Sequence, residues 1–181
     1  MTQSIAAQLD ANAAAAGDAV WLTSPDTGDT VSRDEAAARS REIACQLDTL
    51  GLADGAPVAV AAQNSIWSTL CFTGITAGGY LATPLNLVAG ARVMSYVIAH
   101  SGARVILCTD DQRQLIDEAL ANIDHAVTII RLDPDHGPEW PEGPAPAATP
   151  RTTPDACSAG LLMYTSGTTG NPKGGILSHA N

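Results

Sequence analysis

Short apolar runs alternate with helix-length segments through the middle of the chain, and this alternation limits the possible folds more than any other feature. The runs are continuous, which is typical of strands buried on both faces of a parallel sheet. Helices of about 10 to 15 residues between such strands indicate βαβ units. We therefore predict an α/β fold with a largely parallel sheet, with strands at residues 57–62, 80–85, 104–108 and 126–132 and helices at 65–77, 90–101 and 111–122.

The first 50 residues are predicted to form two helices and a hairpin. Residues 3–15 are rich in alanine, which favours a helix. Residues 19–32 hold two short apolar runs around a Pro-Asp-Thr-Gly-Asp turn signal, which indicates a β-hairpin. Ser32 and Glu35 have the spacing of a capping box and predict a second helix that runs to Leu50.

The chain of 181 residues has the length of one domain, since single domains most often have about 100 to 200 residues. Seven of its eleven prolines lie in residues 133–158, where they fix φ and remove backbone donors. We predict an α/β subdomain over 1–132, a proline-rich surface crossing over 133–158, and a strand, a loop and the start of a further element over 159–181.

The charge of the chain argues against nucleic acid as a partner. Nine Lys and Arg residues against nineteen Asp and Glu give a net charge of −10, which repels a phosphate backbone. Residues 55–91 carry no charged side chain and are long enough to cross a bilayer, but prolines, asparagines and a glycine pair interrupt them. We expect a buried strand, helix and strand there, with no membrane span.

The four cysteines do not have the spacing of a metal site. They form no C-x-x-C pair and lack a nearby histidine that would complete a zinc site, so we predict reduced, mostly buried thiols and no bound metal. The N-terminal segment has no basic residue ahead of an apolar core and so lacks the pattern of a secretory signal. The expected location is the cytoplasm.

Histidines and paired acids elsewhere are interpreted mainly as structural. His100 lies near the end of a predicted helix, where its charge suits the helix dipole. Asp110 and Asp111 fit a helix N-terminus better than a metal site, because no third ligand is close. His179 is left open between contact with a substrate and a surface or capping role.

A loop rich in glycine and hydroxyl side chains follows the apolar run at 159–164. Its glycines, including Gly174, permit positive φ and bring backbone N–H groups close to an anion, while the hydroxyls and one lysine add donors and positive charge. Ligands gather at the carboxyl ends of parallel strands, so the position suits a binding loop. The candidate phosphate-binding residues are Thr165, Ser166, Gly167, Thr168, Thr169, Gly170 and Lys173.

Neither of the two common phosphate motifs explains this loop. A Walker A loop needs Ser or Thr after the lysine, whereas Pro172 precedes Lys173 and Gly174 follows it. The G-x-G-x-x-G spacing of a dinucleotide fingerprint does not occur. The composition therefore indicates a different kind of triphosphate loop.

The string "YTSGTTGNPKG", followed by "LSHAN", resembles the phosphate-loop signature of the adenylate-forming, AMP-binding superfamily, which includes acyl-CoA synthetases, luciferases and peptide-synthetase adenylation domains. "GGYLATPLN" and "YVIAHSGARVILC" are similar to segments that precede the loop in acyl-CoA synthetases, and the likeness extends over about residues 31–181. Thr168 and the ending "LSHAN" resemble acyl-CoA ligases more than peptide synthetases. Gly175 departs from the branched aliphatic residue usual at that position.

The resemblance implies a two-step reaction. A carboxylate attacks the α-phosphate of MgATP to give an acyl-adenylate and pyrophosphate, and a thiol, usually that of coenzyme A, then displaces AMP. Residues 165–170 and Lys173 would hold the β and γ phosphates, with Lys173 as the catalytic residue that stabilises charge on pyrophosphate. The expected cofactors and substrates are ATP, Mg²⁺, coenzyme A and a carboxylic acid, and the expected setting is fatty acid metabolism.

Members of this superfamily are far longer, and the resemblance implies that this chain is the incomplete first part of a large N-terminal domain. Ile176 and Leu177 are expected to begin a strand, and residues 178–181 a helix capped by Ser178. Two hypotheses remain open. The chain represents a carboxylate ligase and is inactive by itself, or it is a non-catalytic remnant or one piece of a split enzyme, completed by a C-terminal portion or a second chain and acting as an interaction module.

Overall fold

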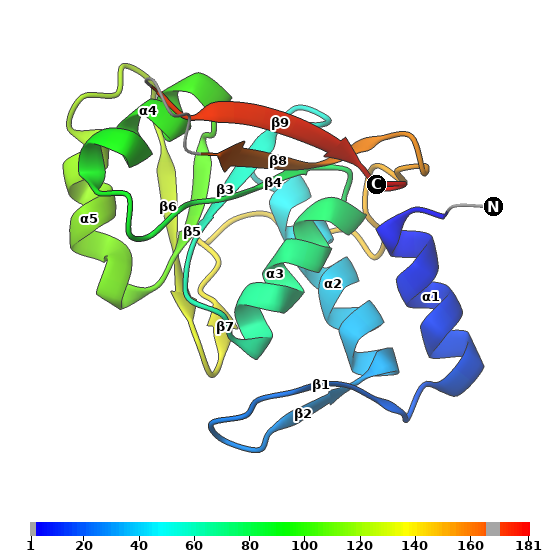
Figure 1. Cartoon of the computed structure of the whole chain (residues 1–181). Coiled ribbons are helices and arrows are strands. Elements are labelled where there is room, and N and C mark those ends of the chain that lie inside the picture. The colour runs from blue at the N-terminus through cyan, green and yellow to red at the C-terminus, as the bar shows by residue number, and fades with distance from the viewer. Residues whose placement is uncertain (1–2, 166–170) are drawn as a thin grey trace.

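The computed structural model describes residues 3–165 and 171–181. Its helices are α1 (Ile5–Ala16), α2 (Arg33–Asp48), α3 (Ile66–Ala77), α4 (Ala91–Ser101) and α5 (Asp110–Leu120). Its strands are β1 (Val20–Thr23), β2 (Thr30–Ser32), β3 (Pro57–Ala61), β4 (Leu81–Pro84), β5 (Val105–Cys108), β6 (Thr128–Asp133), β7 (Gly137–Pro138), β8 (Ala159–Thr165) and β9 (Lys173–Ser178). Figure 1 shows their arrangement.

A seven-stranded sheet with the order β7-β6-β5-β3-β4-β8-β9 forms the centre of the molecule. The five inner strands pair in parallel, while β7 and β9 pair antiparallel at the two edges. Strands β1 and β2 form a separate antiparallel hairpin, as expected from the turn signal between them. The prediction of an α/β fold with a largely parallel sheet is confirmed.

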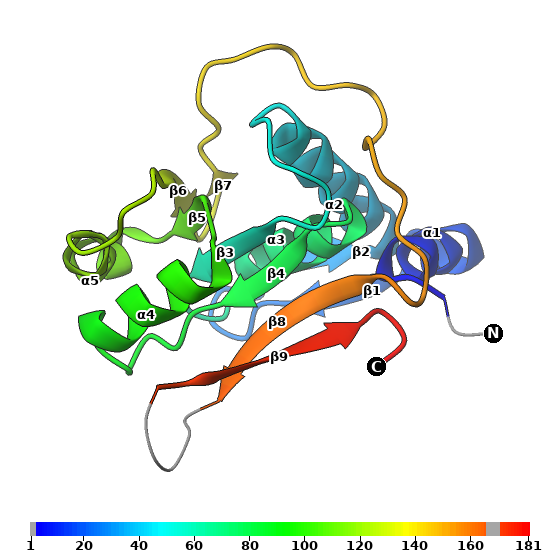
Figure 2. The ribbon, with the colours of Figure 1, turned by 90° about the horizontal axis from the view of Figure 1, so that it is seen from above.

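Helices cover the sheet on both faces, which explains why its strands are continuous apolar runs (Figures 1 and 2). In β3, Val58 and Val60 belong to the core cluster that also holds buried residues of α1, α2 and α3, whereas Ala59 and Ala61 belong to the cluster that holds buried residues of α4 and α5. This alternation follows from the two-residue period of a strand. The charge-free segment at 55–91 forms β3, α3 and β4, as predicted, and within the described ranges no helix has the length and apolarity needed to cross a bilayer.

Local hydrogen bonds explain where α2 begins. The Ser32 hydroxyl accepts the N–H of Glu35 at 3.2 Å, and the Glu35 carboxylate accepts the N–H of Ser32 at 2.9 Å, so the predicted capping box is formed. The helix ends at Asp48 and Thr49 is its C-cap, two residues before the predicted end at Leu50.

The proline-rich crossing has little regular structure beyond β7, and Arg151 within it connects it to residues at and just after the end of α2. Arg151 forms an ion pair with Asp54 at 2.7 Å and donates to the carbonyl of Leu52. Its backbone N–H donates to Asp48, which also accepts the hydroxyl of the buried Tyr80 at 2.6 Å. The domain limits at residues 132 and 158 stay a prediction.

Two expectations for the C-terminal segment were wrong. Strand β9 begins at Lys173 rather than near Ile176, because residues 173–178 pair with β8 along its whole length. Residues 178–181 form a turn instead of a helix start, because the N–H of Asn181 donates to the carbonyl of Ser178 and its side chain accepts the Ser178 hydroxyl.

Candidate functional site

A hairpin formed by β8 and β9 carries the candidate loop. Strand β8 is parallel to β4, so the chain leaves it at the carboxyl edge of the sheet, as predicted (Figure 2). Thr165 and Lys173 are partners in the last pair of the β8–β9 ladder. The hairpin thus brings these two predicted site residues together. The other five, Ser166, Gly167, Thr168, Thr169 and Gly170, lie outside the described residues.

Lys173 is exposed at the end of this hairpin. It is the only lysine in the sequence, and no carboxylate of residues 3–165 or 171–181 forms an ion pair with it. Directly paired residues of an antiparallel ladder place their side chains on the same face, about 5 Å apart at Cβ. The hydroxyl of Thr165 and the ammonium group of Lys173 are therefore available on one face for an anion.

The residue before Thr165 connects the hairpin to α4. His100 Nδ1 lies 2.8 Å from the hydroxyl oxygen of Tyr164, and the two rings meet edge to face. The ring of Tyr96, one turn earlier in α4, stacks on His100 with centroids 5.3 Å apart. Burial, with a smaller contribution from Tyr96, raises the pKa of Tyr164. His100 does lie in the last turn of a helix, but its contact with Tyr164 was not foreseen.

Gly174 was predicted to be a loop glycine with positive φ, but the structure places it in a strand. It is not among the described glycines with positive φ, because it lies within β9 and pairs with Tyr164. A Cβ atom at this position would lie 3.2 Å from Cε1 and Cζ of Tyr164 and 3.2 Å from Cδ1 of Leu162. Gly174 is therefore small because the Tyr164 ring occupies the adjacent space.

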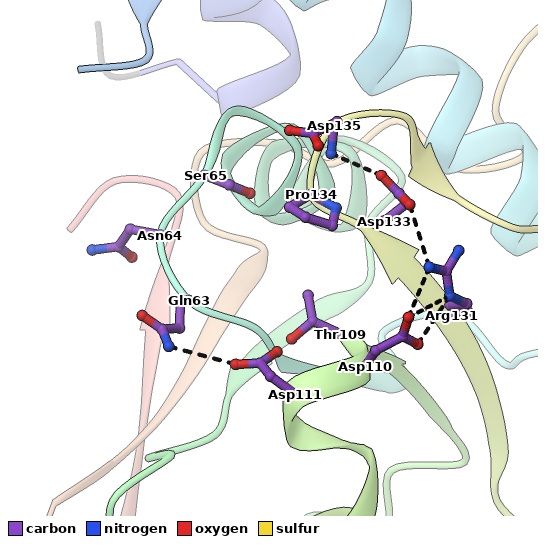
Figure 3. A pocket seen from close by; sticks show the side chains of 10 residues that line it. All are labelled: Gln63, Asn64, Ser65, Thr109, Asp110, Asp111, Arg131, Asp133, Pro134 and Asp135. Carbon is purple, nitrogen blue, oxygen red and sulfur yellow. Dashed lines mark hydrogen bonds and ion pairs between the residues drawn. The ribbon is translucent and has the colours of Figure 1, made fainter. Parts of the chain in front are cut away.

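A polar cleft lies where β3, β5 and β6 end (Figure 3). Its volume is about 510 Å³, and Arg131 in its wall binds Asp110, Asp133 and Glu139. The Arg131 guanidinium lowers the pKa of Asp110, and backbone N–H groups of Asp135 and His136 lower that of Asp133 to about 2. The carboxylates outnumber the one arginine, so the cleft disfavours phosphate.

The acidic pair beside this cleft has the predicted position. Asp110 and Asp111 occupy the first turn of α5, and the Thr109 hydroxyl lowers the pKa of Asp111. Over the described ranges, no three His, Cys, Asp or Glu side chains are grouped so that they could hold a metal ion.

His179 lies at the opposite end of β9 from Lys173. Its Nδ1 atom accepts the first backbone N–H of α1, that of Ile5, at 3.1 Å. Its Nε2 atom is buried with no hydrogen-bond partner among the described residues, and burial lowers its pKa despite the nearby Asp155. This arrangement favours the structural alternative for His179, because the ring joins the two ends of the described chain.

The mostly parallel sheet, and the β8–β9 hairpin that pairs Thr165 with Lys173 at its carboxyl edge, define an α/β protein with a candidate anion-binding site. The family model described as AMP-binding enzyme matches residues 9–181. The chain belongs to the AMP-binding enzyme family.

Curated relatives include ligases and peptide synthetases. The chain is 32% identical over 179 residues to sulfoacetate–CoA ligase of Cupriavidus necator, covering 98% of this chain and 35% of the relative. It is 30% identical to the long-chain-fatty-acid–CoA ligase FadD13 of Mycobacterium tuberculosis, covering 74% and 26%. Surfactin synthase subunit 3 of Bacillus subtilis is 29% identical, with 86% and 12% covered. The chain thus spans about a third or less of the length of these relatives.

Solved structures share the fold. The N-terminal domain of FACL13 from Mycobacterium tuberculosis matches with a TM-score of 0.78 and 26% identity, covering 98% of this chain and 44% of that domain. The anthranilate CoA ligase AuaEII, in complex with anthranoyl-AMP, matches with a TM-score of 0.83 and 21% identity, covering 97% and 35%. At 21% identity the second match concerns the fold alone.

Proposed function

We propose that this chain supplies the polyphosphate-binding loop and the first α/β part of an ATP-dependent, AMP-forming carboxylate–CoA ligase. The observation that carries the proposal is the pairing of Thr165 with an exposed Lys173 at the base of the loop, in a chain of the AMP-binding enzyme family. The carboxylate–CoA assignment is favoured by the two ligases among its relatives.

The loop residues are assigned to the β and γ phosphates of ATP. Hydroxyls and backbone N–H groups of residues 165–170 donate to phosphate oxygens, and Lys173 adds a compact positive charge. Negative charge grows on the leaving pyrophosphate as the carboxylate attacks the α-phosphate. A fixed cation at that place stabilises the transition state more than the bound substrate, which is the condition for faster chemistry.

The second step would transfer the acyl group from AMP to the thiol of coenzyme A. We assign no residue of this chain to that transfer. Mg²⁺ normally binds to carboxylates and substrate phosphates in such sites, but the part of the chain described here offers no cluster of acidic or histidine side chains for a metal. No step of the proposal is therefore assigned to a protein-bound metal ion.

A second candidate function rests on the exposed surface of the hairpin. In the described sheet β9 is an edge strand, and Ile176 and Met163 are 65% and 46% exposed. An unpaired strand edge with apolar side chains is a surface on which another segment can add. This favours a module that is completed by further polypeptide and that is not catalytic alone.

ATP–pyrophosphate exchange distinguishes these candidates. We expect no carboxylate-dependent exchange from the 181-residue chain alone, and exchange after addition of a polypeptide corresponding to the remaining two-thirds of a relative. Lys173→Ala in the completed assembly is expected to raise the barrier of the exchange reaction by about 2 to 4 kcal/mol. This corresponds to an exchange rate about 30- to 1,000-fold lower. Exchange that is unaffected by Lys173→Ala would show the assignment of this lysine to be wrong.

A further inference from the structure

The tip of the β8–β9 hairpin extends beyond the strand that supports it. Strand β8 pairs with β4 in the register Ala82 to Leu161, which places Met163 opposite Pro84, the last residue of β4. Tyr164 and Thr165 therefore lie past the end of β4, and within the β8–β9 ladder their partners are Gly174 and Lys173. A two-stranded ribbon without a third strand is only marginally stable in water. The tip needs another connection to the rest of the fold.

The described side chains provide that connection through α4. His100 and Tyr164 are joined by the 2.8 Å contact between Nδ1 and the phenol oxygen. The stacked ring of Tyr96 restricts rotation of the imidazole, and Tyr164 packs against the core below α4 and α5. The hydrogen bond itself is exposed, but the stacked ring of Tyr96 and the packing of Tyr164 restrict the orientation of both partners.

The connection reaches the lysine through two adjacent pairs of the ladder. The Tyr164 ring lies against Gly174, and Gly174 follows Lys173 directly. Tyr164 faces α4, so the alternation of a strand places Thr165 and Lys173 on the opposite face of the hairpin. Fixing the Tyr164 ring thus sets the direction in which the Lys173 side chain leaves the backbone, without contact between His100 and the anion.

We propose that His100 and Tyr164 are a positioning pair that orients the base of the anion loop, and this inference rests on the proposed function. The pair holds the last two residue pairs of the β8–β9 ladder, Tyr164 with Gly174 and Thr165 with Lys173, in the geometry that binds the polyphosphate. Removal of either hydrogen-bonding atom leaves the sheet folded and lets the tip pivot, so that Lys173 spends less time in the receiving position. The effect is expected on anion affinity rather than on stability.

Titration with inorganic pyrophosphate tests the pair in the 181-residue chain. Reductive ¹³C-methylation keeps the charge of Lys173, and as the only lysine it gives a single side-chain NMR signal. Tyr164→Phe keeps the ring against Gly174 and removes the hydroxyl, and His100→Phe keeps a stacking ring and removes Nδ1. We expect each variant to weaken pyrophosphate binding about three- to tenfold, the range set by one hydrogen bond. The double variant is expected to bind like either single one.

Two further variants separate positioning from general damage. His100→Asn returns an amide near the place of Nδ1 and is expected to bind within about twofold of the unaltered chain. Tyr96→Phe makes the same chemical change as Tyr164→Phe on a neighbouring ring and is expected to have no effect. The pair would be overturned if Tyr164→Phe and His100→Phe bound pyrophosphate as tightly as the unaltered chain, or if the losses were additive in the double variant. A loss in His100→Asn as large as that in His100→Phe would also overturn it. If the unaltered chain does not bind pyrophosphate, the proposed function itself fails.

Discussion

The ring of Tyr164 lies against the backbone of Gly174, its partner across the β8–β9 ladder, in the space that a side chain at Gly174 would need. The neighbouring Gly175 has open space, since a Cβ there would meet only the carbonyl oxygen of Met163 at 3.9 Å. The two adjacent glycines of one strand therefore differ in what they tolerate.

Alanine substitutions at the two glycines should separate this packing from strand propensity. Gly175→Ala is expected to raise the free energy of unfolding by about 0.5 kcal/mol, because glycine is unfavourable within a strand. Gly174→Ala should lose this gain and also weaken pyrophosphate binding, because its methyl group displaces the Tyr164 ring. Urea unfolding and the pyrophosphate titration measure both effects. Identical behaviour of the two variants would be inconsistent with the packing of Tyr164 against Gly174.

His179 should make stability depend on pH. Its folded pKa is lowered, mainly by burial, so the neutral ring is favoured in the folded state. The stability that the neutral ring contributes is therefore fully present above the pKa of the unfolded state, about 6.5. It is lost as the pH falls below that value and through the lower pKa of the folded state. His179→Asn retains an acceptor for the N–H of Ile5 and does not titrate. We expect the thermal melting temperature of this variant to fall less between pH 7 and pH 5 than that of the unaltered chain. If the melting temperature of the variant depended on pH as steeply as that of the unaltered chain, His179 would be excluded as the cause of the pH dependence.

The four cysteines should differ sharply in reactivity. Cys45, Cys71 and Cys108 are buried and Cys157 is exposed. Burial raises the pKa of Cys71 to about 12 and that of Cys108 to about 11, and the thiolate is the reactive form. A thiol reagent at pH 8 should modify Cys157 rapidly and the other three only after addition of denaturant. Rapid modification of two or more thiols in the native chain, located by peptide mass spectrometry, would contradict the burial of Cys45, Cys71 and Cys108.

Tyr80 should hold the proline-rich crossing through Asp48. Tyr80→Phe removes the hydroxyl that donates to Asp48 and is expected to lower the free energy of unfolding by about 1.5 kcal/mol, the lower value for a bond to a charged group. Trypsin should then cut faster after Arg151, whose backbone and side chain depend on the same cluster. Tyr96→Phe is the matched control, and equal cleavage rates in the two variants would show that the hydroxyl does not anchor the crossing.

Local patterns predicted most of the fold. The Ser32–Glu35 capping box, the helix that begins after Ser65 and the continuous apolar run of β5 each depend on neighbouring residues, and each was found as expected. The order of the strands and the antiparallel edges depend on pairing between distant segments, which a local pattern does not contain.

The composition of the sequence selects the candidate site, but it does not contain the site's geometry. Thr165 and Lys173 could be selected from their loop, whereas the contact of His100 with Tyr164 joins residues 64 positions apart and has no local signal. Gly174 was misinterpreted as a turn glycine, because a small residue that makes room for a ring looks the same in a sequence as one that adopts positive φ.

Direct observation of the Lys173 side chain with a panel of anions tests the central claim. The ¹³C-methyl signal of this unique lysine can be followed while pyrophosphate, ATP or AMP is added, and the methylated α-amino group is an internal control. We predict a saturable shift of the Lys173 signal with pyrophosphate and ATP, and little change with AMP, which lacks the β and γ phosphates. A Lys173 signal that does not move with pyrophosphate, or moves equally with AMP, would contradict the assignment of this hairpin to polyphosphate binding.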